Sequence, residues 1–152
     1  MNPLFTRPAT QSDLPHIAAL FDAYRQFYQQ AADLDLATEF IGERMRRSES
    51  VIFLAENDQR EALGFCQLYP TFCSVEAKPI LALYDLYVQP SARQLGAGRL
   101  LLQAAEQHAL GNGFARMDLT TAKTNQAAQS LYESQGWVRD EVFWAYSRSI
   151  AM

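Results

Sequence analysis

The sequence predicts an α/β fold in which helices flank one central, mixed and mostly antiparallel sheet. Apolar runs with strand period and with helical period alternate along the chain. Polar turns separate the early strands as in antiparallel hairpins, whereas a long helical crossover in the second half implies a parallel pair. The length of 152 residues suits one domain. We therefore expect residues 1–152 to form a single domain with about seven strands and about four helices.

The first half of the chain is predicted to hold three strands and two helices. Thr10 to Asp13 offers N-cap residues, and apolar side chains then recur at helical spacing as far as Tyr28. Basic residues near Arg47 suit the last turn of a second helix, because they complement the helix dipole. The predicted elements are a strand over 4–7, helices over about 13–30 and 36–47, and strands over 51–56 and 62–72.

The second half begins with a strand between Pro79 and Pro90, since this apolar run is too short for a confident helix and lacks helical period. Gly111 to Gly113 ends the next helix, and Asn125 and Gly136 bound a short one. The predicted elements are a strand over 80–90, a helix over 96–110, a strand over 114–121, a helix after Asn125, and strands over 138–141 and 142–150.

Composition excludes several classes of function. A net charge of −4 without a basic stripe argues against nucleic-acid binding. No apolar run approaches 18 residues, and the N-terminus lacks the basic and apolar parts of a signal peptide, so we expect no membrane partner and a cytoplasmic location. Cys66 and Cys73 have neither redox nor zinc spacing, and His16 and His108 lie in helical patterns. We expect free thiols and no metal.

A glycine-bearing loop follows the strand that ends at Pro90. It reads Arg93-x-x-Gly96-x-Gly98 and opens a predicted helix. Backbone N–H groups at a helix N-terminus, with glycines that let a ligand approach, form a cradle suited to a diphosphate. The alternative is that the glycines merely allow tight packing of strand against helix. The residue pattern leaves both open.

A second motif lies downstream, and the two together resemble the GNAT (Gcn5-related) N-acetyltransferase superfamily. It reads Asn125-x-x-Ala128-x-x-Leu131-Tyr132-x-x-x-Gly136-Trp137. The start of the chain, Arg7-Pro8-Ala9-Thr10-x-x-Asp13, is similar as well. The tract from Gly64 to Val88 looks closest to the branch that acetylates diamines and polyamines. The resemblance implies the GNAT fold and acetyl-CoA as co-substrate.

The resemblance also implies where acetyl-CoA binds. Its pantetheine arm would lie along the backbone of Leu86, Tyr87 and Val88, where an N–H would polarise the thioester carbonyl. Asn125 would contact the cofactor, although it could instead simply cap its helix. Gln94 stands where many members have glycine, which costs about 1 kcal/mol if the position requires a positive φ. The residues implied at the diphosphate are Arg93, Gln94, Leu95, Gly96, Ala97, Gly98 and Arg99.

Two residues are candidates for catalysis by direct attack of an amine on the thioester. The resemblance places Tyr132 beside the cofactor sulfur, and a phenol is a suitable proton donor for a departing thiolate. Related enzymes often have a glutamate where this chain has Tyr84. Asp85 is then the ionisable group left in an apolar strand, where an unpaired carboxylate would be costly. Its functional alternatives are to bind the substrate amine or to relay the proton of that amine through water. The structural alternative is a salt bridge or hydrogen bond to a neighbouring strand or loop. Alternation puts Asp85 and Tyr87 on the face opposite Tyr84, Leu86 and Val88 unless a bulge intervenes.

The acceptor is expected to be a small primary amine, such as a polyamine, a diamine or an amino-acid-like amine, because aromatic faces with carboxylates suit an ammonium group. A protein lysine or N-terminal amine is the alternative. A non-catalytic acyl-CoA-binding module is the alternative of another class, and nucleotide binding without CoA is a third. A homodimer is compatible with the resemblance. The candidate acceptor residues are Tyr24, Tyr28, Tyr69, Tyr84 and Trp144.

Overall fold

The computed structural model describes residues 3–151, and their contacts divide the chain into two compact units. The first unit extends to Thr120 and the second begins at Thr121. The first unit holds the whole sheet and three of the helices, and the second holds one short helix.

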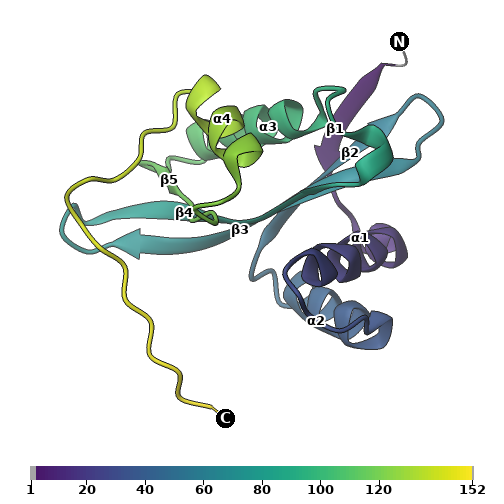
Figure 1. Cartoon of the computed structure of the whole chain (residues 1–152), viewed down its shortest axis with the longest axis horizontal. Coiled ribbons are helices and arrows are strands. Elements are labelled where there is room, and N and C mark those ends of the chain that lie inside the picture. The colour runs from purple at the N-terminus through teal and green to yellow at the C-terminus, as the bar shows by residue number, and fades with distance from the viewer. Residues whose placement is uncertain (1–2, 152) are drawn as a thin grey trace. The chain divides into compact units, whose positions relative to one another are not determined.

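The sheet of the first unit has five strands in the order β1-β2-β3-β4-β5 (Figure 1). The first four strands pair antiparallel with their neighbours, and β4 pairs parallel with β5. This confirms the predicted mixed, mostly antiparallel sheet. The strands are β1 (Leu4–Pro8), β2 (Val51–Asn57), β3 (Ala62–Cys73), β4 (Lys78–Val88) and β5 (Met117–Asp118).

Helices cover both faces of this sheet (Figure 1). On one face lie α1 (Leu14–Phe27), preceded by a 3₁₀ turn over Gln11–Asp13, and α2 (Leu34–Arg46). On the other lies α3 (Ala97–Gly111), after a 3₁₀ turn over Pro90–Ala92. Each of these helices was predicted to within a few residues, because N-caps and apolar spacing are local signals.

Apolar side chains fill the space between the sheet and its helices. On the α1 side, Ile17 and Ile41 pack against the strands, where Phe65 has no exposed surface. On the α3 side, Leu101 is fully buried, and its carbonyl accepts a hydrogen bond from Cys66 Sγ. Both cysteines are free thiols, as predicted, but only Cys66 is buried as expected, since Cys73 is half-buried.

β4 carries a bulge at Tyr84. Gln67 pairs with Asp85 but the next residue of β3, Leu68, pairs with Leu83, so Tyr84 has no opposite residue. A bulge bends its strand and increases the local twist. The pairing of β4 with β5 ends at Ala82, just before this bulge. The predicted strand over 114–121 is therefore wrong in length, since β5 comprises only Met117–Asp118.

The second unit contains α4 (Gln126–Ser134), and Asn125 Oδ1 accepts a hydrogen bond from the Ala128 N–H as its N-cap. This confirms the helix predicted after Asn125. The strands predicted over 138–141 and 142–150 are wrong, because the described residues after Gly136 form neither helix nor strand. Asp140 instead accepts from the backbone N–H groups of Val142 and Phe143 in a turn. A strand requires a ladder partner, and no described segment pairs with these residues.

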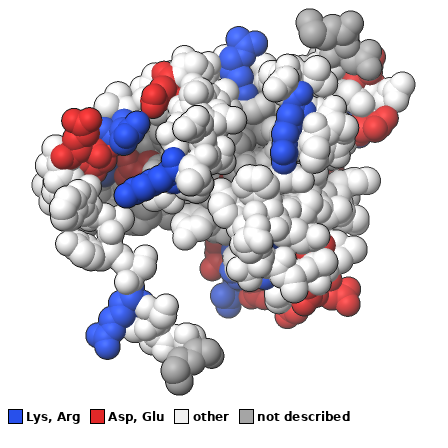
Figure 2. All heavy atoms as spheres, in the orientation of Figure 1, with Lys and Arg blue, Asp and Glu red and all other residues white. Residues whose placement is uncertain are grey.

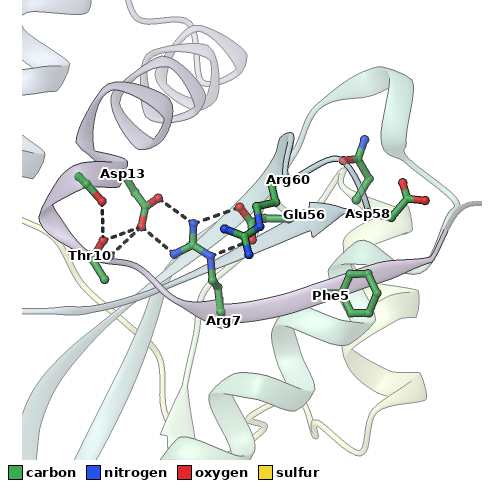
Figure 3. A pocket seen from close by; sticks show the side chains of 9 residues that line it. Phe5, Arg7, Thr10, Asp13, Glu56, Asp58 and Arg60 are labelled. Carbon is green, nitrogen blue, oxygen red and sulfur yellow. Dashed lines mark hydrogen bonds and ion pairs between the residues drawn. The ribbon is translucent and has the colours of Figure 1, made fainter.

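Arg7 on β1 ties two elements together through two carboxylates (Figure 3). Its guanidinium donates to both oxygens of Asp13, at 2.8 and 2.7 Å, and to both oxygens of Glu56, at 2.8 and 3.0 Å. Asp13 also accepts from the Thr10 N–H in a capping box. These residues line a pocket of about 580 Å³ with Phe5, Asp58 and Arg60. The network joins the start of α1 to the sheet edge.

We expect Asp13→Asn to lower the free energy of unfolding by about 1–2 kcal/mol at pH 7, since the Arg7 side chain is 39 % exposed and solvent weakens the pair. Hydrogen bonds from Arg7 hold the pKa of Asp13 far below its usual value. A depressed pKa stabilises the fold above the unfolded pKa, near 4, and this contribution is lost as the pH falls. Urea denaturation from pH 7 to pH 3 should show the two proteins converging.

The control for this experiment is Asp58→Asn, which changes an exposed carboxylate of the same pocket. We expect no measurable loss of stability from it. Equal stability of Asp13→Asn and the wild type at pH 7 would contradict the structural role of the network.

Candidate functional site

The edge of β4 is open beyond Ala82, where its pairing with β5 ends. On its other side β4 stays paired with β3 through to Val88. An unpaired strand edge offers backbone N–H and C=O groups to an extended ligand, which can add as a further strand. Leu86 and Tyr87 lie in this stretch, where no strand of the described residues pairs with β4 on that side.

Asp85 lies at the start of this open stretch and is only 5 % exposed. Gln67 Nε2 donates to its Oδ2 at 2.6 Å. Burial raises the pKa of Asp85, whereas hydrogen bonds from Gln67 and from the Tyr24 hydroxyl lower it. Both donors that favour the ionised form are neutral. A buried carboxyl with a raised pKa is typical of a group that exchanges protons during turnover.

Asp85 and Tyr87 share the face of the sheet that α1 covers, as alternation predicted. The Tyr24 ring lies 6.2 Å from that of Tyr87, and its hydroxyl, which has one proton to donate to either Asp85 or the Tyr84 carbonyl, lies 3.1 Å from that carbonyl. Tyr28 packs edge-on against Tyr24 at 5.1 Å. The structure therefore brings together five of the residues predicted from sequence, namely Tyr24, Tyr28, Tyr84, Asp85 and Tyr87.

Tyr69 and Tyr84 form a second aromatic pair near Asp85. Their rings are 5.6 Å apart, edge to face, and Tyr84 is 69 % exposed because it occupies the bulge. Burial, followed by the charge of Asp85, raises the pKa of Tyr69 to about 12. Aromatic faces beside a carboxylate suit an ammonium group.

The loop before α3 fits a diphosphate. Gly96 adopts φ +90° as the N-cap of α3, with no side-chain cap and no acidic residue in the first turn. The first N–H groups of a helix lack intrahelical partners, so they point at whatever lies beyond the N-terminus. Arg99 adds a cation beside this turn. The Nη2 atom of Arg99 lies 3.9 Å from the point where Gly96 would carry a Cβ if it had a side chain. Gln94 and Leu95 are exposed, whereas Ala97 is buried and anchors the turn.

Arg93 connects this loop to the end of β4. Its Nε donates to the Val88 carbonyl at 2.9 Å, and its guanidinium lies over the rings of Tyr87 and Phe27 at 5.6 and 5.9 Å. The Val88 carbonyl is therefore already bonded. Arg93 supports the loop and the strand end at the same time, and it remains a cation beside the cradle.

We expect Gln94→Gly to raise the free energy of unfolding by up to about 1 kcal/mol, because Gln94 has φ +67° and a side chain is strained there. The strain expected from sequence depended on a positive φ at Gln94, and the structure has one. Thermal unfolding and calorimetric titration with acetyl-CoA would measure stability and affinity together.

The matched control is Gln94→Ala, which removes the same functional group but keeps a Cβ. It should show no gain in stability. Equal gains from the glycine and alanine variants would show that the backbone conformation at this position is not the cause.

Three further predicted residues belong to the second unit. Asn125 caps α4, which is one of its two predicted roles, and a contact with the cofactor stays a prediction. The Tyr132 ring lies 6.0 Å from that of Trp137 within the same unit. Trp144 is 86 % exposed in the segment without regular structure. Their predicted roles in catalysis and acceptor binding stay predictions.

Sequence reasoning missed Gln67 and Ser50. Gln67 has no exposed surface, and its Oε1 accepts a hydrogen bond from Ser50 Oγ at 2.7 Å. One signal was available, because Gln67 interrupts an apolar run from Leu63 to Leu68. A polar side chain in such a run must find a partner when it is buried. The identity of that partner was not readable from spacing.

Other kinds of site find no support in the described part of the chain. Within residues 3–151 there is no group of three His, Cys, Asp or Glu side chains that could hold a metal. None of the described helices combines the length and hydropathy needed to cross a membrane. In Figure 2, acidic and basic side chains lie together over the region of α2, so the basic residues there do not form a separate patch.

Comparison with a family model matches residues 17–137 to the acetyltransferase (GNAT) family. A Bacillus subtilis (strain 168) protein described as the uncharacterized N-acetyltransferase YhfO is 46 % identical over 144 residues, which is 95 % of this chain and 96 % of that protein. An aminoglycoside N(6')-acetyltransferase type 1 of Klebsiella aerogenes is 34 % identical over 103 residues, or 65 % and 66 % of the two chains.

A solved structure also matches closely. The crystal structure of a probable acetyltransferase superposes with a TM-score of 0.92 at 39 % identity, covering 97 % of this chain and 99 % of the other. The match spans both described units. The fold of the chain and the order of its elements therefore agree with those of an acetyltransferase.

Proposed function

This chain belongs to the GNAT family of acetyltransferases, and we propose that it acetylates the primary amine of a small cationic molecule, such as a polyamine, a diamine or an amino-acid-like amine. The chain is an acetyl-CoA-dependent N-acetyltransferase, so the proposal concerns the acceptor and the roles of individual residues. Because the family match runs from residue 17 to residue 137, we also propose that both units make up one acetyltransferase domain.

One observation carries the proposal: the buried Asp85 carboxyl lies at the start of the open β4 edge, beside the Tyr69 and Tyr84 rings. A cationic amine would be attracted by the carboxylate and by the aromatic faces. The similarity to the Klebsiella aerogenes aminoglycoside acetyltransferase supports a small-molecule amine as acceptor. A small acceptor also suits a carboxyl that is only 5 % exposed.

Acetyl-CoA supplies an activated acetyl thioester, which a neutral amine attacks directly in a ternary complex. Asp85 would accept the proton that the acceptor ammonium must lose, directly or through a water molecule. A backbone N–H at Leu86 to Val88 would polarise the thioester carbonyl. Tyr132 would donate a proton to the departing sulfur. Gln94 to Arg99 would hold the diphosphate on the N-terminus of α3.

A panel of amines tests this function. Diamines, polyamines, an aminoglycoside, amino acids and a lysine peptide are incubated with acetyl-CoA, and released thiol is measured from pH 5 to pH 10. We expect turnover with one of the small amines. Turnover with the peptide alone would favour a protein acceptor. Tight binding of acetyl-CoA without thiol release in the presence of any amine would favour a non-catalytic module. Calorimetric binding of ATP without binding of acetyl-CoA would contradict both the acetyltransferase and the non-catalytic acyl-CoA-binding module.

A cytoplasmic location and a homodimer stay predictions of the sequence. Gel filtration with light scattering would establish the oligomeric state directly.

A further inference from the structure

Gln67 joins Ser50 to Asp85 in a chain of hydrogen bonds inside the first unit. The residue lies on β3 directly opposite Asp85 on β4 and has no exposed surface. Its Nε2 donates to Asp85 Oδ2 at 2.6 Å, and its Oε1 accepts from Ser50 Oγ at 2.7 Å. Both ends of the amide are therefore engaged.

The chemistry of the neighbours determines which way the Gln67 amide points. When Asp85 is ionised it can only accept hydrogen bonds, so the NH₂ end of the amide then faces it, as in the structure. The oxygen end faces Ser50, whose hydroxyl is free to rotate and donates to it. A flipped amide would set its oxygen 2.6 Å from the carboxyl oxygen, a contact that only a protonated Asp85 could turn into a hydrogen bond. The observed orientation therefore goes with the ionised carboxylate, and Ser50 satisfies the amide oxygen in that orientation.

We propose that Gln67, hydrogen-bonded at its other end to Ser50, is a positioning residue that holds the Asp85 carboxylate in place and favours its ionised, proton-accepting form. This inference rests on the proposed function of Asp85 as the group that takes the acceptor's proton. Gln67 itself has no exposed surface and acts through Asp85.

Two effects oppose each other at Asp85. Burial raises its pKa, and the hydrogen bond from Gln67 is the first of the two contributions that lower it, ahead of that from Tyr24. A hydrogen bond to a charged group is stronger than one to a neutral group, so it favours the ionised state. Without the Gln67 donor, the pKa of Asp85 would rise further and the carboxylate would be protonated over a wider pH range.

The groups around Asp85 come from several elements. Tyr24 faces it from α1, Cys66 and Tyr69 are coupled to it from β3, and Arg44 and Glu49, at the end of α2 and just after it, act on Tyr69. Burial raises the pKa of Cys66 to about 12, and the pKa of Tyr69 is also about 12. Neither of these two groups titrates in the acidic range, where the loss of the Gln67 donor should be visible.

The test compares the pH dependence of kcat/KM for the wild type, Gln67→Met and Ser50→Ala. Methionine matches glutamine in length but cannot donate a hydrogen bond. We expect the acidic limb of Gln67→Met to move to higher pH by about one unit, a roughly tenfold loss of rate below the midpoint. Ser50→Ala should move it in the same direction by less, because Gln67 remains. Gln103→Met, the same change on the exposed face of α3, should leave the profile unchanged.

A readout independent of turnover accompanies the kinetics. The carboxyl of Asp85 is titrated by ¹³C NMR in the same proteins, and we expect its midpoint to rise in Gln67→Met and less in Ser50→Ala. A uniform fall in kcat with an unmoved acidic limb would overturn the inference, since it indicates a merely structural role. An Asp85 titration midpoint that does not move would also overturn the inference. If Gln67→Met does not fold, the same two measurements on Ser50→Ala test the inference.

Failure of the proposed function gives a different pattern. If the wild type acetylates no amine, the proposed role of Asp85 as proton acceptor is contradicted. The NMR titration still shows whether Gln67 controls the ionisation of Asp85.

Discussion

Asp85→Asn is expected to reduce kcat about 100-fold or more, because asparagine cannot accept the proton of the acceptor ammonium. The measurement is thiol release at saturating acetyl-CoA and amine. The variant should keep its architecture, since the oxygen of the introduced amide can still accept from Gln67 and its NH₂ group can donate to the Tyr24 hydroxyl. Binding of acetyl-CoA should change little, because the proposed diphosphate site lies on the separate loop before α3.

The same variant should be more stable than the wild type at neutral pH. Burial raises the pKa of Asp85, so its folded-state pKa lies above its unfolded value. For such a carboxyl, stability falls as the pH rises from the unfolded pKa, near 4, through the folded pKa, by about 1.4 kcal/mol for each unit of the difference. Asparagine carries no such cost, and thermal unfolding at a series of pH values should show a gap that opens above about pH 4.

The control is Asp58→Asn on the exposed turn after β2, which should change neither turnover nor the pH dependence of stability. Retention of turnover by Asp85→Asn would remove Asp85 from proton transfer. A loss of stability at neutral pH would instead mean that the ionised carboxylate is needed as an acceptor for Gln67 and Tyr24, and is therefore a structural group.

Tyr132→Phe should lower kcat by a factor on the order of 100 to 1000 while the Kd for acetyl-CoA stays the same. The change removes the proposed proton donor but keeps the aromatic ring that packs 6.0 Å from Trp137. The loss should be smaller with an acyl donor whose thiol is more acidic, because such a leaving group needs less protonation. Steady-state kinetics and calorimetric binding measure the two quantities separately.

Tyr146→Phe is a suitable control, since it removes another phenol from the second unit at a position that is 89 % exposed. It should leave turnover intact. Equal kcat values for Tyr132→Phe and the wild type would show that Tyr132 matters only for its ring, and the departing thiolate would then take its proton from solvent.

Local patterns predicted most of the helices and the early strands. Asn125 is followed by α4 and caps it, and Gly96 immediately precedes α3, because capping and glycine preferences act within one turn of the chain. The same reasoning overestimated β5 and predicted two strands after residue 137 that the structure does not show. Residues with strand propensity form a strand only where a neighbouring strand is in position to pair with them.

In the candidate site as well, the features that depend on neighbouring residues were predictable and those that depend on distant residues were not. The loop of the proposed anion cradle was predictable, since Arg93, Gly96 and the start of α3 are within a few residues of one another. The environment of Asp85 was not predictable, because it depends on partners that are distant in the sequence. Gln67 is 18 residues away, and Ser50 is another 17 residues from Gln67.

The sequence by itself determined the class of fold, the position of the glycine-bearing loop before α3 and the order of the two motifs of the acetyltransferase family. Each depends on spacing within a short segment, where backbone geometry limits the choices. Only the tertiary structure decided that the pairing of β4 with β5 ends at Ala82, just before a bulge at Tyr84, and that Asp85 is buried against Gln67. Register and burial are properties of packed segments, so the ionisation of Asp85 follows from the sheet as a whole.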